Sequence, residues 1–225
     1  MNEVLSQEKL SLSEKIKYFF INPRKFYTGG NNKSSWFLLF VLLVMTGSFL
    51  QGKTIATFFS TVMNMGGEVE EEAVAIVGKI SMLFGLGMGV IGSVITIFLT
   101  SLIILLSVKF ILKGEITYKQ VLSIYCISNI PTIIFNVIIL LFYDQVANTV
   151  SLTEFMTLFI RKVNFLSIWS LALLIIGISV VSKVSLRKSA ALFIVFAFIV
   201  LTFNFGSFFI SEGMSTEIPK LELPE

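Results

Sequence analysis

The sequence predicts an all-α integral membrane protein, a bundle of five transmembrane helices preceded by a short amphipathic helix at the membrane interface. Three observations predict this fold. The 225 residues are 55% hydrophobic and only 14% charged, whereas a soluble domain usually has about a quarter charged residues. The charged residues leave five long uncharged intervals, and the basic residues are distributed unevenly among the segments that connect them.

The five uncharged intervals define the predicted spans, because a helix needs about 20 apolar residues to cross the hydrocarbon core. The next longest interval, 54–67, is too short to cross. The connection at 53–79 is the longest, and its EVEEEAVAIV portion is expected to begin an outer helix continuous with the second span. The predicted spans are residues 34–52, 80–108, 120–143, 163–182 and 189–211.

The orientation follows from the basic residues, which accumulate in cytoplasmic connections. Residues 1–33, 109–119 and 183–188 contain 12 of the 17 Lys and Arg residues. We therefore expect a multi-pass protein of a bacterial plasma membrane, with a cytoplasmic N-terminus and an extracytoplasmic C-terminus. Its predicted parts are an N-terminal segment (1–33), a membrane domain (34–210) and an acidic tail (211–225). The polar start also lacks the apolar core of a cleavable signal peptide, so the first span is expected to be an uncleaved anchor.

The N-terminal segment predicts a short helix near the membrane surface. Ser11 and Glu14 have the spacing of a capping box, and Pro23 is expected to end the helix at Asn22. The basic and aromatic residues that follow suit a lipid headgroup layer with anionic phosphates. Recognition of another protein would use the same residue types. The predicted contact residues for anionic lipid or a partner are Pro23, Arg24, Lys25 and Phe26.

The composition also excludes several function classes. The chain has no His, and none of the five intervals contains an Asp, Glu, Lys or Arg. Zinc motifs that need His, Ser–His catalysis and an intramembrane proton relay are therefore not expected. No Walker-type loop occurs, and the basic residues do not form a patch with stacking aromatics, so nucleic-acid binding is not expected either. The sequence thus predicts no enzyme, no catalytic or metal-binding residue and no cofactor.

One face of the second predicted span consists of small residues. Such residues let helix backbones approach closely in lipid. Packing against another span of the same chain is the preferred interpretation, homo-oligomerisation is the second, and a conduction pathway is the third. The residues of this face are Gly85, Gly89, Ser93, Thr96 and Thr100.

The third predicted span carries a polar stripe and a proline. Four polar residues recur at intervals of 4, 3 and 4, which places them on one helical face. The proline is expected to kink the helix, because it lacks an N–H and its ring crowds the preceding turn. Hydrogen bonding between helices is the preferred interpretation of the stripe, and a hinge or a shallow polar pocket is the alternative. The residues are Tyr125, Asn129, Pro131, Thr132 and Asn136.

Four stretches of the sequence show a resemblance to a known family. They are INPRKFY before the first span, TYKQVLSIYCISNIP leading into the third, the tract from Trp169 through IIGIS, and KVSLRKSA before the fifth. Together they resemble the bacterial branch of the Yip (Ypt/Rab-interacting) family over about residues 15–210. The resemblance implies five spans and a non-enzymatic protein that works through partners.

The resemblance also suggests which partners to expect. Eukaryotic relatives associate with prenylated small GTPases, but this sequence lacks their Asp-Leu-Tyr-Gly-Pro motif. Some bacterial relatives look like accessory proteins of ABC-type export systems. We therefore expect an assembly or accessory partner of another membrane complex, with an ABC transporter as a candidate partner. The alternative is a transporter or channel for a small neutral or lipidic solute that uses the polar stripe, and a third hypothesis is the organisation of lipid.

Overall fold

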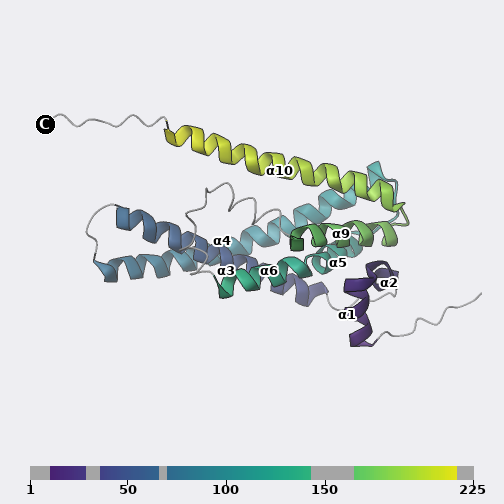
Figure 1. The fold of residues 1–225 in the computed structure, drawn as a ribbon, viewed down its shortest axis with the longest axis horizontal. Helices are drawn as coiled ribbons and strands as arrows, with labels where there is room; N and C mark the ends of the chain where they lie inside the picture. Colours follow the sequence, from purple (N-terminus) through teal and green to yellow (C-terminus); the bar gives the residue numbers. More distant parts are fainter. Residues whose placement is uncertain (1–10, 29–35, 66–69, 143–164, 217–225) are drawn as a thin grey trace, which may run out of the picture.

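The computed structural model describes residues 11–28, 36–65, 70–142 and 165–216, which are helical apart from short connections (Figure 1). No strand occurs in these four ranges, which agrees with the predicted all-α class. A π-helical turn, η2, directly follows α4. In chain order the elements are α1 (Leu12–Ile21), α2 (Pro23–Thr28), α3 (Trp36–Met65), α4 (Glu71–Leu106), η2 (Ser107–Ile111), α5 (Tyr118–Ser128), α6 (Ile130–Leu141), α9 (Phe165–Val181) and α10 (Leu186–Thr216).

Several of these helices are long and apolar enough to cross a membrane. Within the described ranges, Trp36–Met63 and Glu72–Ile111 meet this condition, and the bent pair of α5 and α6 makes a third span if it counts as one. The helix α9 is apolar but has 17 residues. The structure thus supports a membrane protein with helical spans, and the count of five stays a prediction.

The N-terminal segment forms two helices instead of the one that was predicted. Ser11 caps α1 as expected, because its Oγ accepts from the Glu14 N–H and the Glu14 carboxylate accepts from the Ser11 N–H. Asn22 ends α1, and its Oδ1 then accepts from the Lys25 N–H at 3.2 Å. Pro23 is the first residue of α2, where its fixed φ and missing N–H suit a helix start. One Asn-Pro pair therefore both ends the first helix and begins the second.

The helices α3 and α4 form a long antiparallel pair. As predicted, α4 begins in the acidic run and continues into the second span. In contrast, α3 continues to Met65, through half of the connection predicted at 53–79. This stretch contains hydroxyl residues whose side chains donate to carbonyls four residues earlier, as Thr54 does to Leu50 and Thr57 to Lys53. The polar side chains are thus satisfied within the helix, which explains why they do not end it.

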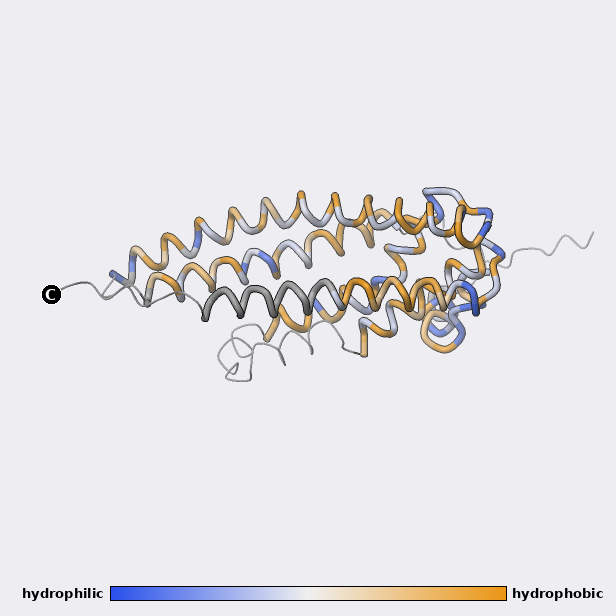
Figure 2. The backbone as a smooth tube through the Cα atoms, turned by 90° about the horizontal axis from the view of Figure 1, so that it is seen from above, coloured by the Kyte–Doolittle hydropathy of each residue, from blue (hydrophilic) through white to orange (hydrophobic). Residues whose placement is uncertain are grey.

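The best buried part of the protein lies where α2, α5 and α9 meet. Ile124 of α5 and both Leu173 and Ile178 of α9 are completely buried. The connection between η2 and α5 also reaches this region, since a β-carbon placed on Gly114 would lie 2.7 Å from Val184 Cγ2. Hydrophilic residues gather at the same end of the bundle (Figure 2). We call it the basic end; it comprises α1, α2, residues 112–117 and the α9–α10 turn (182–185).

Candidate functional site at the basic end

Tyr27 fastens α2 to the bundle. Its side chain is only 3% exposed. The ring lies over Gly177 of α9, where an added β-carbon would be 2.8 Å from Tyr27 Cζ and 2.6 Å from Ile124 Cγ2. Only a residue without a side chain leaves room for the ring at this point. The contact therefore joins the N-terminal segment to α9 and α5.

The hydroxyl of Tyr27 has no hydrogen-bond partner among the described residues. Burial raises the pKa of Tyr27, so the hydroxyl stays protonated at neutral pH. An unpaired buried hydroxyl is unfavourable, which indicates that packing of the ring is what stabilises this contact. In the sequence Tyr27 stands in an aromatic stretch, and no local pattern singles it out as the anchor.

The four predicted contact residues divide into two groups. Pro23 and Arg24 line a hollow at the basic end. Phe26 is half-buried and packs edge-to-face against Phe19, with ring centroids 5.5 Å apart. Lys25 turns back to α1, where its Nζ donates to Tyr18 Oη at 2.8 Å and lies 4.4 Å from the ring centroid. Of the two basic side chains of α2, Arg24 is therefore the one that lines the hollow.

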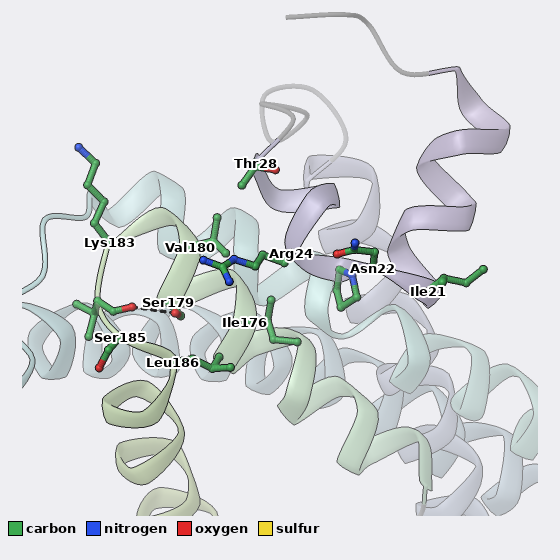
Figure 3. Close-up of a pocket in the computed structure, with 12 residues that line it drawn as sticks. Ile21, Asn22, Arg24, Thr28, Ile176, Ser179, Val180, Lys183, Ser185 and Leu186 are labelled. Atoms are coloured by element: carbon green, nitrogen blue, oxygen red, sulfur yellow. Dashed lines mark hydrogen bonds between the residues drawn. The ribbon is translucent and has the colours of Figure 1, made fainter. Parts of the chain in front are cut away.

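The hollow lies between α2 and the α9–α10 turn and has a volume of about 670 Å³. Figure 3 shows the Arg24 guanidinium reaching over α9 toward Ser179 and Val180, while Lys183 extends outward from the turn. The turn is held by Ser179 Oγ, which donates to the Val184 carbonyl at 2.8 Å. Lys183 has φ 57°, the left-handed conformation common after a helix C-terminus.

A second hollow, of about 440 Å³, shares Lys183, Val184 and Ser185 with the first. Its lining adds Lys113 and Lys188, and it also contains Glu115. The two hollows together place basic side chains from four elements around the α9–α10 turn. The arrangement can bind an anion. Within the described ranges, no group of three or more His, Cys, Asp or Glu could hold a metal ion.

The predicted small-residue face lies partly against α3. A β-carbon on Gly85 would be 2.9 Å from Gly52 Cα, and one on Gly89 would be 2.9 Å from Ser48 Cα. Ser93 continues this contact, since its Oγ would be 3.6 Å from a β-carbon on Gly47. The last two residues differ: Thr96 is exposed, and Thr100 is half-buried beside Tyr125 of α5, with which it forms a side-chain hydrogen bond. The face thus packs within the chain at its glycines and not along its whole length.

The predicted polar stripe is divided by a bend of 41° between α5 and α6. Asn129 lies at the break, where both its backbone N–H and its Nδ2 donate to the Tyr125 carbonyl. Pro131 follows as a buried residue in the first turn of α6. Thr132 Oγ1 lies 3.0 Å from Ser170 Oγ of α9, a hydrogen bond between helices.

Thr132 and Asn136 also line a cavity of about 440 Å³ between α3, α6 and α9. The other polar residues around it are Gln51, Thr54 and Ser167, which lie outside the predicted stripe. They come from two other helices, and no local spacing in the sequence links them. The cavity is therefore a second candidate site, with neutral polar groups and no charged residue in its lining.

The comparison with protein families decides the family. The Yip1 domain matches residues 17–208. The chain belongs to the Yip1 family. Neither curated proteins nor solved structures yield a match to the chain.

The matched range of the Yip1 domain includes all of α2, residues 112–117 and the α9–α10 turn. It begins within α1 and extends to α10, so it contains Tyr27, Gly177 and the α9–α10 turn. The resemblance seen in the sequence is thus confirmed at the level of the family. The match identifies a membrane protein of the Yip family and assigns no partner, substrate or orientation.

Proposed function

We propose that this protein is a non-enzymatic Yip-family protein of a bacterial plasma membrane that acts as an assembly or accessory partner of another membrane complex. An ABC-type export system is the candidate partner. The main support for this proposal is the way in which α2 is held against the bundle. Tyr27 fixes the helix to the bundle core, while Arg24 stays exposed beside the α9–α10 turn. A rigidly held basic surface without catalytic groups suits recognition better than chemistry.

The proposal includes five spans, formed by α3, α4, the α5–α6 pair, α9 and α10. Three segments of the chain support this count. They are α2, residues 112–117 and the α9–α10 turn, and all three lie at the same end of the bundle (Figure 1). The chain must therefore cross the membrane twice between one of these segments and the next. Between residues 112–117 and the α9–α10 turn, the two crossings are the bent α5–α6 pair and α9. At about 1.5 Å per residue α9 has nearly the length of the hydrocarbon core. The excess of basic residues makes this end cytoplasmic and places the C-terminus outside.

Co-purification tests the proposal. We expect mild-detergent purification of the wild type to recover a discrete stoichiometric membrane partner, identified by mass spectrometry. The variant Arg24→Glu/Lys25→Glu, at matched expression, should lose that partner because it reverses the charge of the α2 surface. The matched control is Lys15→Glu/Lys17→Glu, which reverses two charges on α1 and should retain the partner. Absence of a stoichiometric partner from the wild type, or equal loss from both variants, would contradict the proposal.

The cavity between α3, α6 and α9 favours a second candidate function, a transporter for a small neutral or lipidic solute. Its lining of amide and hydroxyl groups suits a neutral polar molecule. We expect this function to appear as uptake of radiolabelled glycerol, or of a fluorescent lipid analogue, into proteoliposomes. Asn136→Ala should then abolish uptake, whereas Val137→Ala, on the exposed side of the same helix, should not. Uptake that is absent, or that is insensitive to Asn136→Ala, would exclude this function for the cavity.

A further inference from the structure

The hollow beside α2 differs from the other surfaces of the basic end in its mixed lining. Twelve residues surround it, and they come from α1, α2, α9, the α9–α10 turn and the start of α10 (Figure 3). One part of the lining is polar and includes Arg24, Lys183 and Ser185. The other part is apolar and includes Ile21 and Leu186. In Figure 3 Leu186 and Ile176 lie on the same side as the Arg24 guanidinium, whereas Ile21 is at the outer edge of the hollow.

The charge of the hollow is entirely positive. None of its twelve lining residues is acidic, and two are basic. The guanidinium of Arg24 reaches across the space (Figure 3), and this group can form two parallel hydrogen bonds to a phosphate. The N-terminus of α10 also lies here and has no acidic residue in its first turn, so its backbone N–H groups add to the positive potential. An anion placed near Arg24 would therefore meet attractive groups from two elements.

The apolar part of the lining distinguishes a lipid from a soluble anion. Ile21 is 74% exposed and Leu186 is 52% exposed, although both border a site for a charged group. A soluble phosphate would gain nothing from these side chains. An acyl chain next to the headgroup would cover Leu186 and remove apolar surface from water. Leu186 also begins α10, a predicted membrane span, so this side of the hollow faces the bilayer boundary.

We propose that the hollow between α2 and the α9–α10 turn binds one anionic phospholipid. The phosphate lies against the Arg24 guanidinium and the N-terminus of α10, with Lys183 at the rim. The first part of the acyl chain covers Leu186 and the neighbouring Ile176. This site goes beyond the proposed accessory function, because it gives the protein a ligand of its own in the cytoplasmic leaflet.

Native mass spectrometry of the purified full-length protein tests this site. The protein is titrated in detergent with phosphatidylglycerol and, separately, with phosphatidylcholine. One equivalent of phosphatidylglycerol should bind more tightly than phosphatidylcholine by about tenfold or more. Near a membrane surface each basic residue contributes a factor of about five in affinity. We therefore expect Arg24→Gln and Lys183→Asn each to weaken phosphatidylglycerol binding by about fivefold, and their combination by about 25-fold.

The control variants distinguish a specific lipid site from general electrostatic attraction. Lys119→Gln removes one exposed basic charge that does not line the hollow, and it should change the affinity by less than twofold. Asn adopts the left-handed conformation of Lys183 readily, so Lys183→Asn is expected to fold normally. Equal weakening by Lys119→Gln, or equal binding of the two lipids to the wild type, would overturn the proposal. Displacement of the lipid by equimolar glycerol phosphate would show a soluble phosphate ligand and overturn it as well.

This test is independent of the accessory function. It uses purified protein without a partner, so the lipid site can fail while co-purification succeeds. Lys183→Asn leaves α2 unchanged and should therefore weaken phosphatidylglycerol binding by about fivefold but keep the protein partner. Lys25→Glu should do the reverse, because Lys25 contacts Tyr18 and does not line the hollow.

Discussion

Replacing Tyr27 by alanine is expected to detach α2 from the bundle. The change removes a ring that is almost completely buried against Gly177 and Ile124. Truncation of a large buried aromatic side chain typically costs about 3–5 kcal/mol. Tyr27 is the one buried residue of the six-residue helix α2, so the change removes the best-buried contact between α2 and the bundle. We expect rapid trypsin cleavage after Arg24 and Lys25 in detergent, together with a lower midpoint of thermal unfolding.

Two further variants sharpen this prediction. Tyr27→Phe keeps the ring and removes the hydroxyl that has no partner in the described parts of the chain, so stability should be unchanged or about 1 kcal/mol higher. Gly177→Ala changes the same contact on the α9 side. It should lower the free energy of unfolding by about 1–3 kcal/mol, because the new methyl group would overlap Ile124. Gly87→Ala is its control, since a β-carbon there meets nothing within 4 Å. If Tyr27→Ala stayed as resistant to trypsin as the wild type, the ring would not be the anchor.

Replacing Gly89 by leucine is expected to separate α3 from α4. The β-carbon alone would lie 2.9 Å from Ser48 Cα, and a backbone atom cannot rotate away as a side chain can. Overpacking of this kind costs about 3 kcal/mol at the upper end of its usual range. Membrane insertion should be unaffected, because leucine is more apolar than glycine. The measurement is an unfolding titration of the variant in mixed detergent micelles.

The control for this variant lies on the same helix. A β-carbon on Gly92 meets nothing within 4 Å, so Gly92→Leu should be as stable as the wild type. Size-exclusion chromatography with light scattering then distinguishes the two interpretations of the small-residue face. Packing within the chain predicts an unchanged oligomeric state for Gly89→Leu, whereas a homodimer interface predicts its loss. Unchanged stability of Gly89→Leu would show that this face does not hold α3 and α4 together.

Local features of the fold followed from the sequence because their partners are close in the chain. The capping box predicted at Ser11 joins residues three positions apart, and it is present in the structure. The bend near Pro131 belongs to the same class, since proline acts on the turn that precedes it. The second helix in NPRKFY was missed because the Asn-Pro pair was treated only as the end of α1.

The sites depended on contacts that no spacing reveals. Gly85 and Gly89 were recognised as a packing face, but only the structure shows that Gly52 and Ser48 are opposite them. The cavity lined by Asn136 also needs Gln51 and Ser167 from two other helices. Arg24 and Lys25 were both predicted as contact residues, yet of these two only Arg24 lines the hollow. Its neighbour instead binds Tyr18, one helix earlier.

The sequence alone determined the helical membrane class and the Yip family, because composition, the lengths of the apolar intervals and the local motifs are properties of neighbouring residues. The tertiary structure decided which aromatic residue anchors the N-terminal segment. Tyr27 and Gly177 are 150 positions apart in the sequence, and each is unremarkable on its own helix. Their contact exists because α5 and α9 leave a gap that one ring fills. That packing also sets the position of Arg24 and so creates the basic hollow for which we propose a lipid.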